Sequence, residues 1–192
     1  MTKATIFGDG NMGTAIAGVL TQGGATVEHI TTSDQGKAAV TGDLVILAVP
    51  YPALDDITAA YGDQLAGKVV VDITNPVNFE TFDSLTVPAG SSAAAELAEK
   101  LPSSRVLKAF NTNFAATLAS KTVGGQPTPV LIAGDDADAK RTLADALTAR
   151  GVQAVDAGAL DRARELEALG FLQLTLAASG KTAWTGGFAL VS

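Results

Sequence analysis

Cysteine is absent from this chain of 192 residues, and histidine occurs once, as His29. Without thiols there can be no disulfide, no thiolate metal site and no cysteine nucleophile. A single imidazole also excludes a histidine cluster, so we expect no metal site. His29 falls inside a strand-like segment, where a packed or half-exposed side chain is the ordinary outcome.

Clusters of positive charge and long hydrophobic runs are missing as well. The formal net charge is −7, and the concentrated lysine and arginine that a nucleic-acid partner requires do not occur. The first apolar run, residues 4–7, is broken by Gly8 and Asp9 and is too short for a signal peptide. The longest later run, residues 44–50, is too short to span a membrane. We therefore expect a cytoplasmic protein with neither nucleic-acid nor membrane partners.

What the chain does contain is an alternation of short apolar, β-branched segments with alanine-rich helical stretches. Strands are predicted at residues 4–7, 26–31, 44–49, 69–73, 106–110, 130–133 and 152–155. Helices are predicted at residues 12–22, 54–61, 93–101 and 137–149. Such alternation is typical of an α/β protein with a mainly parallel sheet and helices on both of its faces.

The connection between the second and third predicted strands is unusually short. Only about a dozen residues separate Thr32 from Leu44, and a parallel crossover needs at least about that many, helix included. Residues 35–40 can therefore form no more than a turn or two of helix. The extra strand that a standard dinucleotide fold places here does not fit, so we predict a shortened sheet edge after the second strand.

Residues 161–179 are predicted as one long C-terminal helix. Apolar residues at helical spacing, with further ones on a second side, are Leu166, Leu169, Leu172, Leu176, Phe171 and Leu174. A helix that is apolar on two sides is buried on both, so we expect packing in the core and across a homodimer interface. Gly170 in mid-helix indicates the close approach of another backbone. The tail at residues 187–191 could form a short final strand.

A glycine-rich turn, Gly-Asp-Gly-Asn-Met-Gly at residues 8–13, follows the first predicted strand and opens the first predicted helix. In this context it is the fingerprint of a dinucleotide site. Gly8 permits a sharp turn, Gly10 lets a pyrophosphate approach the backbone, and Gly13 lets helix and strand pack closely. Free N–H groups at the helix start would bind the phosphates. The alternative is a turn that serves packing alone. The predicted cofactor contacts are Gly8, Asp9, Gly10, Asn11, Met12 and Gly13.

The residues after the second predicted strand bear on the choice between NAD and NADP. A carboxylate about 20 residues beyond the glycines ordinarily binds the ribose diol, whereas here Thr31, Thr32 and Ser33 follow the strand. Their hydroxyls suit a 2′-phosphate, and Lys37 can supply positive charge. Asp34 could still reach the ribose from this loop, and Ser33 or Asp34 could equally cap a short helix. We favour NADP(H) as the cofactor, with Thr31, Thr32, Ser33 and Lys37 as contacts.

Amides and prolines gather at three successive strand ends, in residues 48–53, 72–78 and 108–115. Ligands of open parallel sheets bind beyond the carboxyl ends of the strands. The amides of Asn75, Asn78, Asn111 and Asn113 can donate to and accept from a carboxamide or a heterocycle edge, although each asparagine alone could be a turn or cap residue. The predicted contacts are Ala48, Val49, Pro50, Tyr51, Asn75, Pro76 and Asn111.

No conventional acid–base apparatus can be recognised in these loops. Tyr51 and Lys108 are the only plausible proton donors, and Lys108 is predicted to lie within a strand. Hydride transfer to a flavin-like ring requires positioning more than proton chemistry by the protein. The catalytic residue therefore stays unassigned.

Five segments of the sequence, in this order, resemble a known family. They are GDGNMG, AVPYPA, VVDITNP, KAFNTNFA and, at residues 156–167, DAGALDRARELE. Together they resemble the NADP oxidoreductases that depend on the deazaflavin coenzyme F420, and their bacterial dinucleotide-binding relatives, over nearly the whole chain. The resemblance implies a Rossmann-type NAD(P)-binding fold and direct hydride transfer between NADPH and a flavin-like partner. The domain is also similar to the reductase part of membrane ferric reductases.

The chain departs from the family pattern after the second strand. The family usually carries Ser or Thr followed by Arg there, to hold the 2′-phosphate, whereas the matching pair here is Thr32-Ser33. Lys37 matches a family position that is also basic. The short crossover also removes family sequence, so the packing of the adenine is expected to differ.

The sequence thus predicts an enzyme that transfers hydride between NADPH and a small redox acceptor: deazaflavin F420, a flavin or a quinone. One domain over residues 1–192 is expected, with residues 1–135 as the nucleotide-binding core and residues 136–192 completing the pocket. A non-catalytic NADP(H)-binding sensor is the alternative, because no acid or base is identifiable. An imine reductase similar to pyrroline-carboxylate reductases fits the glycine motif, but the chain lacks the long helical dimerisation domain that such enzymes need.

Overall fold

A twisted seven-stranded sheet forms the centre of the molecule, with strand order β2-β1-β3-β4-β5-β8-β9. The computed structural model describes residues 2–34, 36–148 and 151–191. β1 to β5 run parallel to one another. The strands are β1 (Lys3–Phe7), β2 (Thr26–Ile30), β3 (Leu44–Leu47), β4 (Val69–Asp72), β5 (Arg105–Lys108), β8 (Pro129–Gly134) and β9 (Gln153–Gly158).

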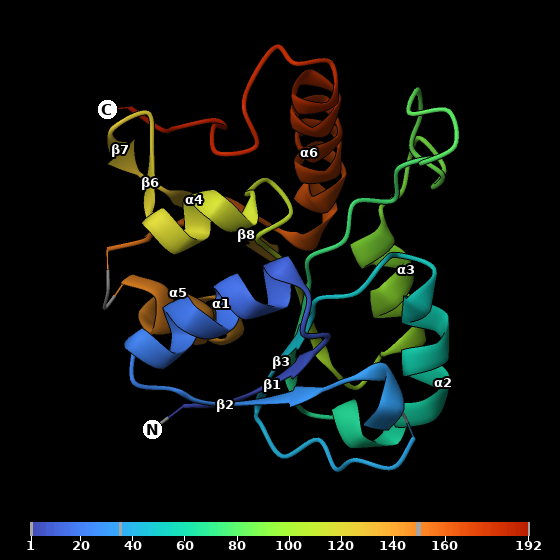
Figure 1. Ribbon diagram of the computed structural model, residues 1–192. Helices are drawn as coiled ribbons and strands as arrows, with labels where there is room; N and C mark the ends of the chain where they lie inside the picture. Colours follow the sequence, from blue (N-terminus) through green and yellow to red (C-terminus); the bar gives the residue numbers. More distant parts are fainter. Residues whose placement is uncertain (1, 35, 149–150, 192) are drawn as a thin grey trace.

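Helices cover both faces of this sheet, as Figure 1 shows. One face packs against α1, α4 and α5, and the other against α2 and α3. The helices are α1 (Asn11–Gln22), α2 (Ala53–Leu65), α3 (Ala93–Lys100), α4 (Ala115–Ser120), α5 (Ala137–Thr148) and α6 (Ala163–Ala178). The predicted α/β, Rossmann-type fold is confirmed, and most of the predicted helices and strands agree within a few residues at their ends.

The buried central strands explain why the sequence reads as continuous apolar runs. All four residues of β3 are buried. Leu44 and Ile46 belong to the core on the α1 side, whereas Val45 and Leu47 belong to the core on the α2 side. Because successive side chains of a strand point to opposite faces, a sheet covered on both faces needs apolar residues at every position.

The predicted shortening of the sheet after its second strand is confirmed. Among the described strands β2 pairs with β1 alone and forms the sheet edge, where the standard order 3-2-1-4-5-6 has one more strand. The short connection is fixed by side chains: Glu28 accepts hydrogen bonds from the hydroxyls of Thr5 and Thr41, and the Thr5 hydroxyl accepts one from the Gly42 N–H at 2.9 Å. Burial works to raise the pKa of Glu28, but the hydrogen bonds from Thr41 and Thr5 outweigh it, so this pKa is lowered.

The described residues 36–40 contain no helix, which stays within the limit of a turn or two expected for residues 35–40. A 3-10 turn, η1 (Thr32–Asp34), follows β2, and residues 36–40 form turns and irregular chain. Gln35 lies outside the described residues, as do residues 149–150 at the end of the predicted helix 137–149. Asp34 satisfies the backbone of this turn locally, since its carbonyl accepts the N–H groups of Lys37 and Ala38.

Two features of the C-terminal half differ from the sequence prediction. β8 runs antiparallel to β5, because the chain turns back through α4 and a small hairpin, β6 (Thr122–Val123) and β7 (Gln126–Pro127). α4 and this hairpin were not predicted, since they are short and lack clear periodicity. The tail at residues 187–191 is irregular chain, so the predicted final strand is wrong.

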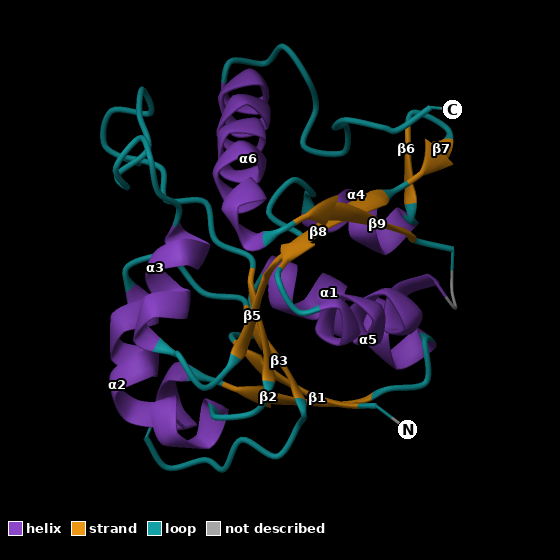
Figure 2. Cartoon of the chain, turned by 180° about the vertical axis from the view of Figure 1, so that it is seen from behind, coloured by secondary structure: helices purple, strands orange, loops and turns teal. Residues whose placement is uncertain are grey.

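α6 stands at the carboxyl ends of the parallel strands, next to the loop of residues 76–91, and it follows a 3-10 turn, η2 (Leu160–Arg162) (Figure 2). Its buried face differs from the expected leucine face and consists of Ala163, Leu166, Glu167, Gly170, Gln173 and Ala177. The other leucines are half-buried, and Leu172 is exposed. Among the described residues, no helix has the length and apolar character needed to cross a membrane.

Candidate functional site

The glycine turn between β1 and α1 is held rigidly against its neighbours. Gly8 has φ +98°, and a Cβ there would lie 2.3 Å from the Ala48 carbonyl oxygen. A Cβ on Gly13 would lie 2.5 Å from the Gly8 carbonyl oxygen. The Gly8 N–H donates to the Ile30 carbonyl at 2.9 Å, and His29 Nδ1 lies 2.9 Å from the Gly8 carbonyl oxygen. His29 is thus a structural contact of the turn, and Gly8 and Gly13 are required for packing.

Gly10 differs from these two glycines because nothing lies within 4 Å of a Cβ placed on it. It is the N-cap of α1, and no side chain caps the helix. The first N–H groups of an α-helix have no partners within the helix, and the helix dipole places partial positive charge there. An open, uncapped N-terminus of a helix of 12 residues therefore suits a diphosphate. The Thr14 hydroxyl donates a hydrogen bond to the Asp9 carbonyl oxygen at 3.1 Å.

The loop after β2 is organised around Asp34. Its carboxylate accepts hydrogen bonds from the Thr31 N–H at 3.1 Å and the Thr31 hydroxyl at 2.6 Å. The Thr31 and Ser33 hydroxyls lie 2.8 Å apart. Hydrogen bonds from Thr31 lower the pKa of Asp34, so its negative charge persists at neutral pH. Of the hydroxyls that were predicted to face a 2′-phosphate, that of Thr31 is therefore engaged with a carboxylate and that of Ser33 contacts the Thr31 hydroxyl.

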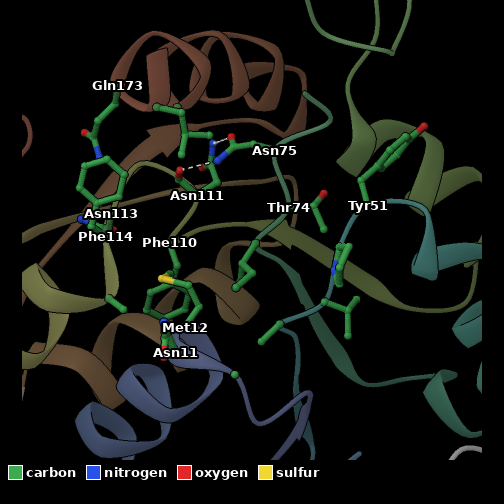
Figure 3. A pocket seen from close by; sticks show the side chains of 18 of the residues that line it. Asn11, Met12, Tyr51, Thr74, Asn75, Phe110, Asn111, Asn113, Phe114 and Gln173 are labelled. Atoms are coloured by element: carbon green, nitrogen blue, oxygen red, sulfur yellow. Dashed lines mark hydrogen bonds between the residues drawn. The ribbon is translucent and has the colours of Figure 1, made fainter. Parts of the chain in front are cut away.

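A cavity of about 820 Å³ opens at the carboxyl ends of the strands, between the start of α1, the start of α4 and one side of α6 (Figure 3). Predicted contacts that line it are Gly10, Asn11, Met12, Ala48, Val49, Pro50, Tyr51, Asn75 and Asn111. Predicted contacts outside its lining are Gly8, Asp9, Gly13, Thr31, Thr32, Ser33, Lys37 and Pro76. The first three of these belong to the glycine turn, and the following four belong to the loop after β2.

Most of the other lining residues come from beyond β5. Apolar residues predominate among them, together with three polar side chains: Ile73, Thr74, Phe79, Phe110, Asn113, Phe114, Ala115, Ala116, Gly170, Gln173, Leu174 and Trp184. Gln173 could have been noticed in the sequence, because it interrupts an apolar helical stretch. Trp184 carries no such signal, since an irregular tail brings it to the cavity.

Two asparagines at the strand ends bind each other and α6 (Figure 3). Asn75 Nδ2 donates to the Asn111 carbonyl at 2.8 Å, and Asn111 Nδ2 donates to Asn75 Oδ1 at 2.9 Å and to the Leu166 carbonyl at 2.8 Å. A Cβ on Gly170 would lie 2.3 Å from Asn75 Oδ1 and 2.9 Å from the Asn111 carbonyl oxygen. The prediction that Gly170 marks the close approach of another backbone is confirmed.

Asn78 has a different role from the other asparagines. Its Oδ1 accepts the N–H of Glu80 at 3.1 Å, which is the ordinary behaviour of a turn residue. Asn78 therefore organises the loop of residues 76–91 and is absent from the lining of the cavity.

A buried ion cluster lies beneath the cavity. Lys108 Nζ is 2.9 Å from Asp72 Oδ2 and 2.7 Å from Glu167 Oε1, and all three side chains are almost completely buried. Lys108 Nζ also donates to the Thr74 carbonyl, and Glu167 accepts the N–H groups of Ala93 and Ala94 at the start of α3. Burial raises the pKa of Glu167, although Lys108 opposes this. Lys108 thus lies in a strand, as predicted, and supports the site from below.

Tyr51 lines the cavity, but its hydroxyl is directed away from it (Figure 3). The hydroxyl donates to Glu96 on α3, and burial together with this carboxylate raises the pKa of Tyr51 far above its usual value. A phenol in this setting does not release its proton near neutral pH. Neither of the two candidate proton donors therefore presents a proton to the cavity.

Four residues of the cavity wall keep a buried side-chain oxygen without a hydrogen-bond partner among the described residues: Thr74, Asn111, Asn113 and Gln173. Buried polar atoms are almost always paired, so each such atom calls for an explanation. Their concentration in one wall indicates a place where a ligand or water molecules complete the hydrogen bonds.

Comparisons with known proteins agree with this geometry. The sequence profile of a family described as NADP oxidoreductase, coenzyme F420-dependent, matches residues 25–76. The F420-dependent NADP reductase of Methanocaldococcus jannaschii is 30% identical over 172 residues, which cover 88% of this chain and 76% of that protein. A candidate F420-dependent NADP reductase from Arthrobacter sp. FB24, solved by crystallography, is 25% identical with a TM-score of 0.85, and the match covers 100% of both chains.

The metalloreductase STEAP3 of Rattus norvegicus is 35% identical over 133 residues. This match covers 69% of the present chain and 26% of the rat protein, so the chain spans about a quarter of that relative. The match to the archaeal reductase, by contrast, spans most of both proteins. The chain therefore belongs to the family of F420-dependent NADP reductases.

Proposed function

We propose that this protein is an oxidoreductase that transfers hydride between NADP(H) and a flavin-like acceptor, with the deazaflavin F420 as the first candidate. The observation that carries the proposal is one continuous cavity that runs from the open N-terminus of α1 to α6. Its volume of about 820 Å³ lies toward the upper end of the range of about 300–1,000 Å³ for small-molecule sites. A nicotinamide and a second ring can therefore share it.

In this proposal the dinucleotide extends across the glycine turn. The diphosphate binds the N–H groups that follow Gly10, and the nicotinamide enters the cavity near Met12 and the segment of residues 48–51. The adenosine end lies toward Thr31, Thr32, Ser33 and Lys37 at the end of β2. The Asp9 carbonyl accepts a hydrogen bond from the Thr14 hydroxyl and so helps to hold the glycine turn.

The main task of the protein in this reaction is to position the two rings. Hydride passes directly between two rings that are held face to face, and holding reactants in contact accounts for a large part of such rate enhancements. The bonds between Asn75, Asn111 and α6 supply rigidity at the strand ends. F420 is favoured over a flavin or a quinone because the family relatives that match over most of their length are named for it.

Gly10→Ala tests the site without disturbing the fold. A methyl group at this position meets nothing within 4 Å in the protein, so the melting temperature should stay within about 2 °C. The methyl group would face the diphosphate, and we expect NADPH affinity to fall by about tenfold or more in calorimetric titration.

Gly18→Ala is the matched control, because Gly18 lies in α1 and a Cβ there is also free of contacts. It should raise stability by up to about 1 kcal/mol and leave NADPH affinity unchanged. Equal NADPH affinity in wild type and Gly10→Ala would refute this placement of the diphosphate. Absence of NADPH oxidation with F420, FMN and menadione alike would refute the enzyme and favour a nucleotide-binding sensor.

The domain division, the cellular location and the oligomeric state of the protein are also proposals. We treat residues 1–135 as the nucleotide-binding core and residues 136–192 as the part that completes the pocket, which is supported by Gly170, Gln173, Leu174 and Trp184 in the cavity wall. We further propose a cytoplasmic homodimer, in keeping with the exposed apolar side chain of Leu172 on α6.

A further inference from the structure

Large aromatic side chains are scarce in this protein, yet several of them gather at the cavity. Phe, Trp and Tyr make up 5% of the residues, and the cavity wall includes Phe79, Phe114 and Trp184. Phe79 and Trp184 are 64% and 52% exposed. Figures 1 and 2 show that the loop carrying Phe79 and the tail carrying Trp184 lie on opposite sides of α6. Exposed aromatic surface at a cavity mouth is characteristic of a ligand contact.

Phe114 and Trp184 form a continuous aromatic surface, which we call the aromatic shelf. Their ring centroids are 5.0 Å apart with an interplanar angle of 56°. Phe114 is buried and lies directly before α4, so it is fixed by the fold. The tail passes beside α6, where a Cβ on Gly187 would lie 3.4 Å from Gln173 Oε1. The fixed phenyl ring thus supports the indole, and the free surface of the indole belongs to the cavity wall.

We propose that the aromatic shelf is the binding surface for the ring system of the electron acceptor, with Trp184 as a specificity-determining residue. This inference rests on the proposed function and adds to it the place and the chemical class of the second ring. The wall of the same cavity includes Gly10 and Met12, beside the proposed nicotinamide position, and the shelf residues together with Gln173 and Leu174. A planar conjugated ring gains both apolar burial and stacking on such a surface.

The amides beside the shelf indicate what the edge of that ring carries. Asn113 Nδ2 donates to the Pro129 carbonyl at 2.8 Å, which leaves Asn113 Oδ1 without a partner, and Gln173 Oε1 is also unpartnered among the described residues. Both are at least nine-tenths buried. Amide oxygens accept hydrogen bonds, so a ring edge with N–H donors would satisfy them. The pyrimidinedione of a flavin or deazaflavin has such a donor, whereas a quinone does not.

Trp184 is the only tryptophan in the chain, so its fluorescence reports on the shelf alone. Titration of the wild-type protein with F420 and with FMN, each in the presence of NADP⁺, should quench this fluorescence with saturation. N-acetyltryptophanamide treated in the same way corrects for light absorbed by the ligand. Menadione, which has no N–H donor, should bind more weakly than whichever of F420 and FMN binds the tighter.

Three variants isolate the contribution of the indole. Trp184→Leu should weaken acceptor binding by about tenfold, as judged by calorimetry, because it removes stacking but keeps an apolar side chain. Trp184→Phe should retain binding within about threefold. Phe188→Leu is the matched control, since Phe188 is 40% exposed on the same tail but is absent from the cavity wall. NADPH affinity should be unchanged in all three.

Unchanged acceptor affinity in Trp184→Leu, or an equal loss of affinity in Phe188→Leu, would overturn the proposal that the shelf binds the acceptor. Tighter binding of menadione than of F420 and FMN would overturn it as well. These results are separable from the proposed function. NADPH oxidation by Trp184→Leu with an unchanged KM for the acceptor would retain the enzyme and reject the shelf. Acceptor binding that depends on Trp184, without any hydride transfer in the wild type, would retain the shelf and reject the enzyme.

Discussion

Single residues decide the chemistry of this site, and Asp34 is the clearest case. It lies in the loop after β2, close to where a carboxylate binds the diol of NAD in other dinucleotide folds. In this chain the carboxylate holds Thr31 by two hydrogen bonds. The same loop carries Lys37, whose charge contributes to lowering the pKa of Asp34. A 2′-phosphate bound here would therefore meet one positive and one negative side chain.

Asp34→Asn should strengthen NADPH binding by about three- to tenfold, because it removes a like charge near the 2′-phosphate and keeps an oxygen that can accept from Thr31. NADH affinity should change little. Parallel calorimetric titrations with the two nucleotides measure both effects. Asp83→Asn is the control, since Asp83 likewise accepts two side-chain hydrogen bonds in a loop, at 2.6 and 2.9 Å. An unchanged ratio of NADPH to NADH affinity in Asp34→Asn would contradict this role.

At the scale of elements, the cavity depends on how α6 is attached to the sheet. Two attachments hold α6. The Asn111 amide donates to the Leu166 carbonyl of α6 and to Asn75. The buried cluster of Lys108, Asp72 and Glu167 is the second. The cluster joins β4, β5, α6 and the start of α3. Removal of one member of such a buried cluster leaves uncompensated charge in a medium of low polarity.

Lys108→Met should lower the free energy of unfolding by about 3–5 kcal/mol, because two buried carboxylates lose their partner. Glu167→Gln should cost less, since burial already raises the pKa of Glu167 and favours its neutral form. Urea denaturation compares the two variants. Lys100→Met, which breaks the exposed pair with Asp55, should cost no more than about 1 kcal/mol. Equal stability of Lys108→Met and wild type would show that the cluster has no structural role.

The short crossover between β2 and β3 should be sensitive to acid. The lowered pKa of Glu28 means that this group adds stability above its unfolded value of 4.5 and loses it as pH falls through the folded value. Glu28→Gln should therefore show a smaller decline of the urea midpoint between about pH 5 and pH 3 than wild type. Glu167 acts in the opposite sense, because its raised pKa gives stability below 4.5 that is lost as pH rises through the folded value.

Glu99→Gln is the control for this measurement, since Glu99 is exposed on α3. Its pH dependence of unfolding should follow the wild-type curve. If Glu28→Gln follows that curve too, the bonds from Thr5 and Thr41 do not stabilise the crossover.

For the whole molecule, the sequence predicted the alternating strands and helices better than the contacts between distant segments that complete the sheet and the cavity. The glycine turn, the parallel strands β1 to β5 and the shortened edge follow from local patterns and loop lengths. The antiparallel β8, the partnership of Asp72, Lys108 and Glu167, and the arrival of Trp184 at the cavity depend on contacts between distant segments. No local propensity encodes such contacts, and α4 with its hairpin is too short for periodicity to reveal it.

The exposed apolar residues of the described chain lie mostly on α6 and the tail, namely Leu172, Trp184, Phe188, Leu190 and Val191. We expect self-association through α6 in the proposed homodimer, because a mid-helix leucine that is 50% exposed gains from burial. Leu172→Glu should shift the sedimentation velocity profile toward the monomer. Ala60→Glu adds the same charge on an exposed position of α2 and should not do so. A monomeric wild type at micromolar concentration would reject the dimer.

The single cavity that joins the start of α1 to the aromatic shelf also constrains the order of events. In the proposed reaction both partners must be present together, so a ternary complex would form and each electron pair would cross in one step without being stored on the protein. The rate with one substrate will therefore depend on the concentration of the other in the pattern of a sequential mechanism. If the nicotinamide lies against the wall of residues 48–51, as proposed, only its opposite side can meet the acceptor, and transfer would be confined to one prochiral hydrogen.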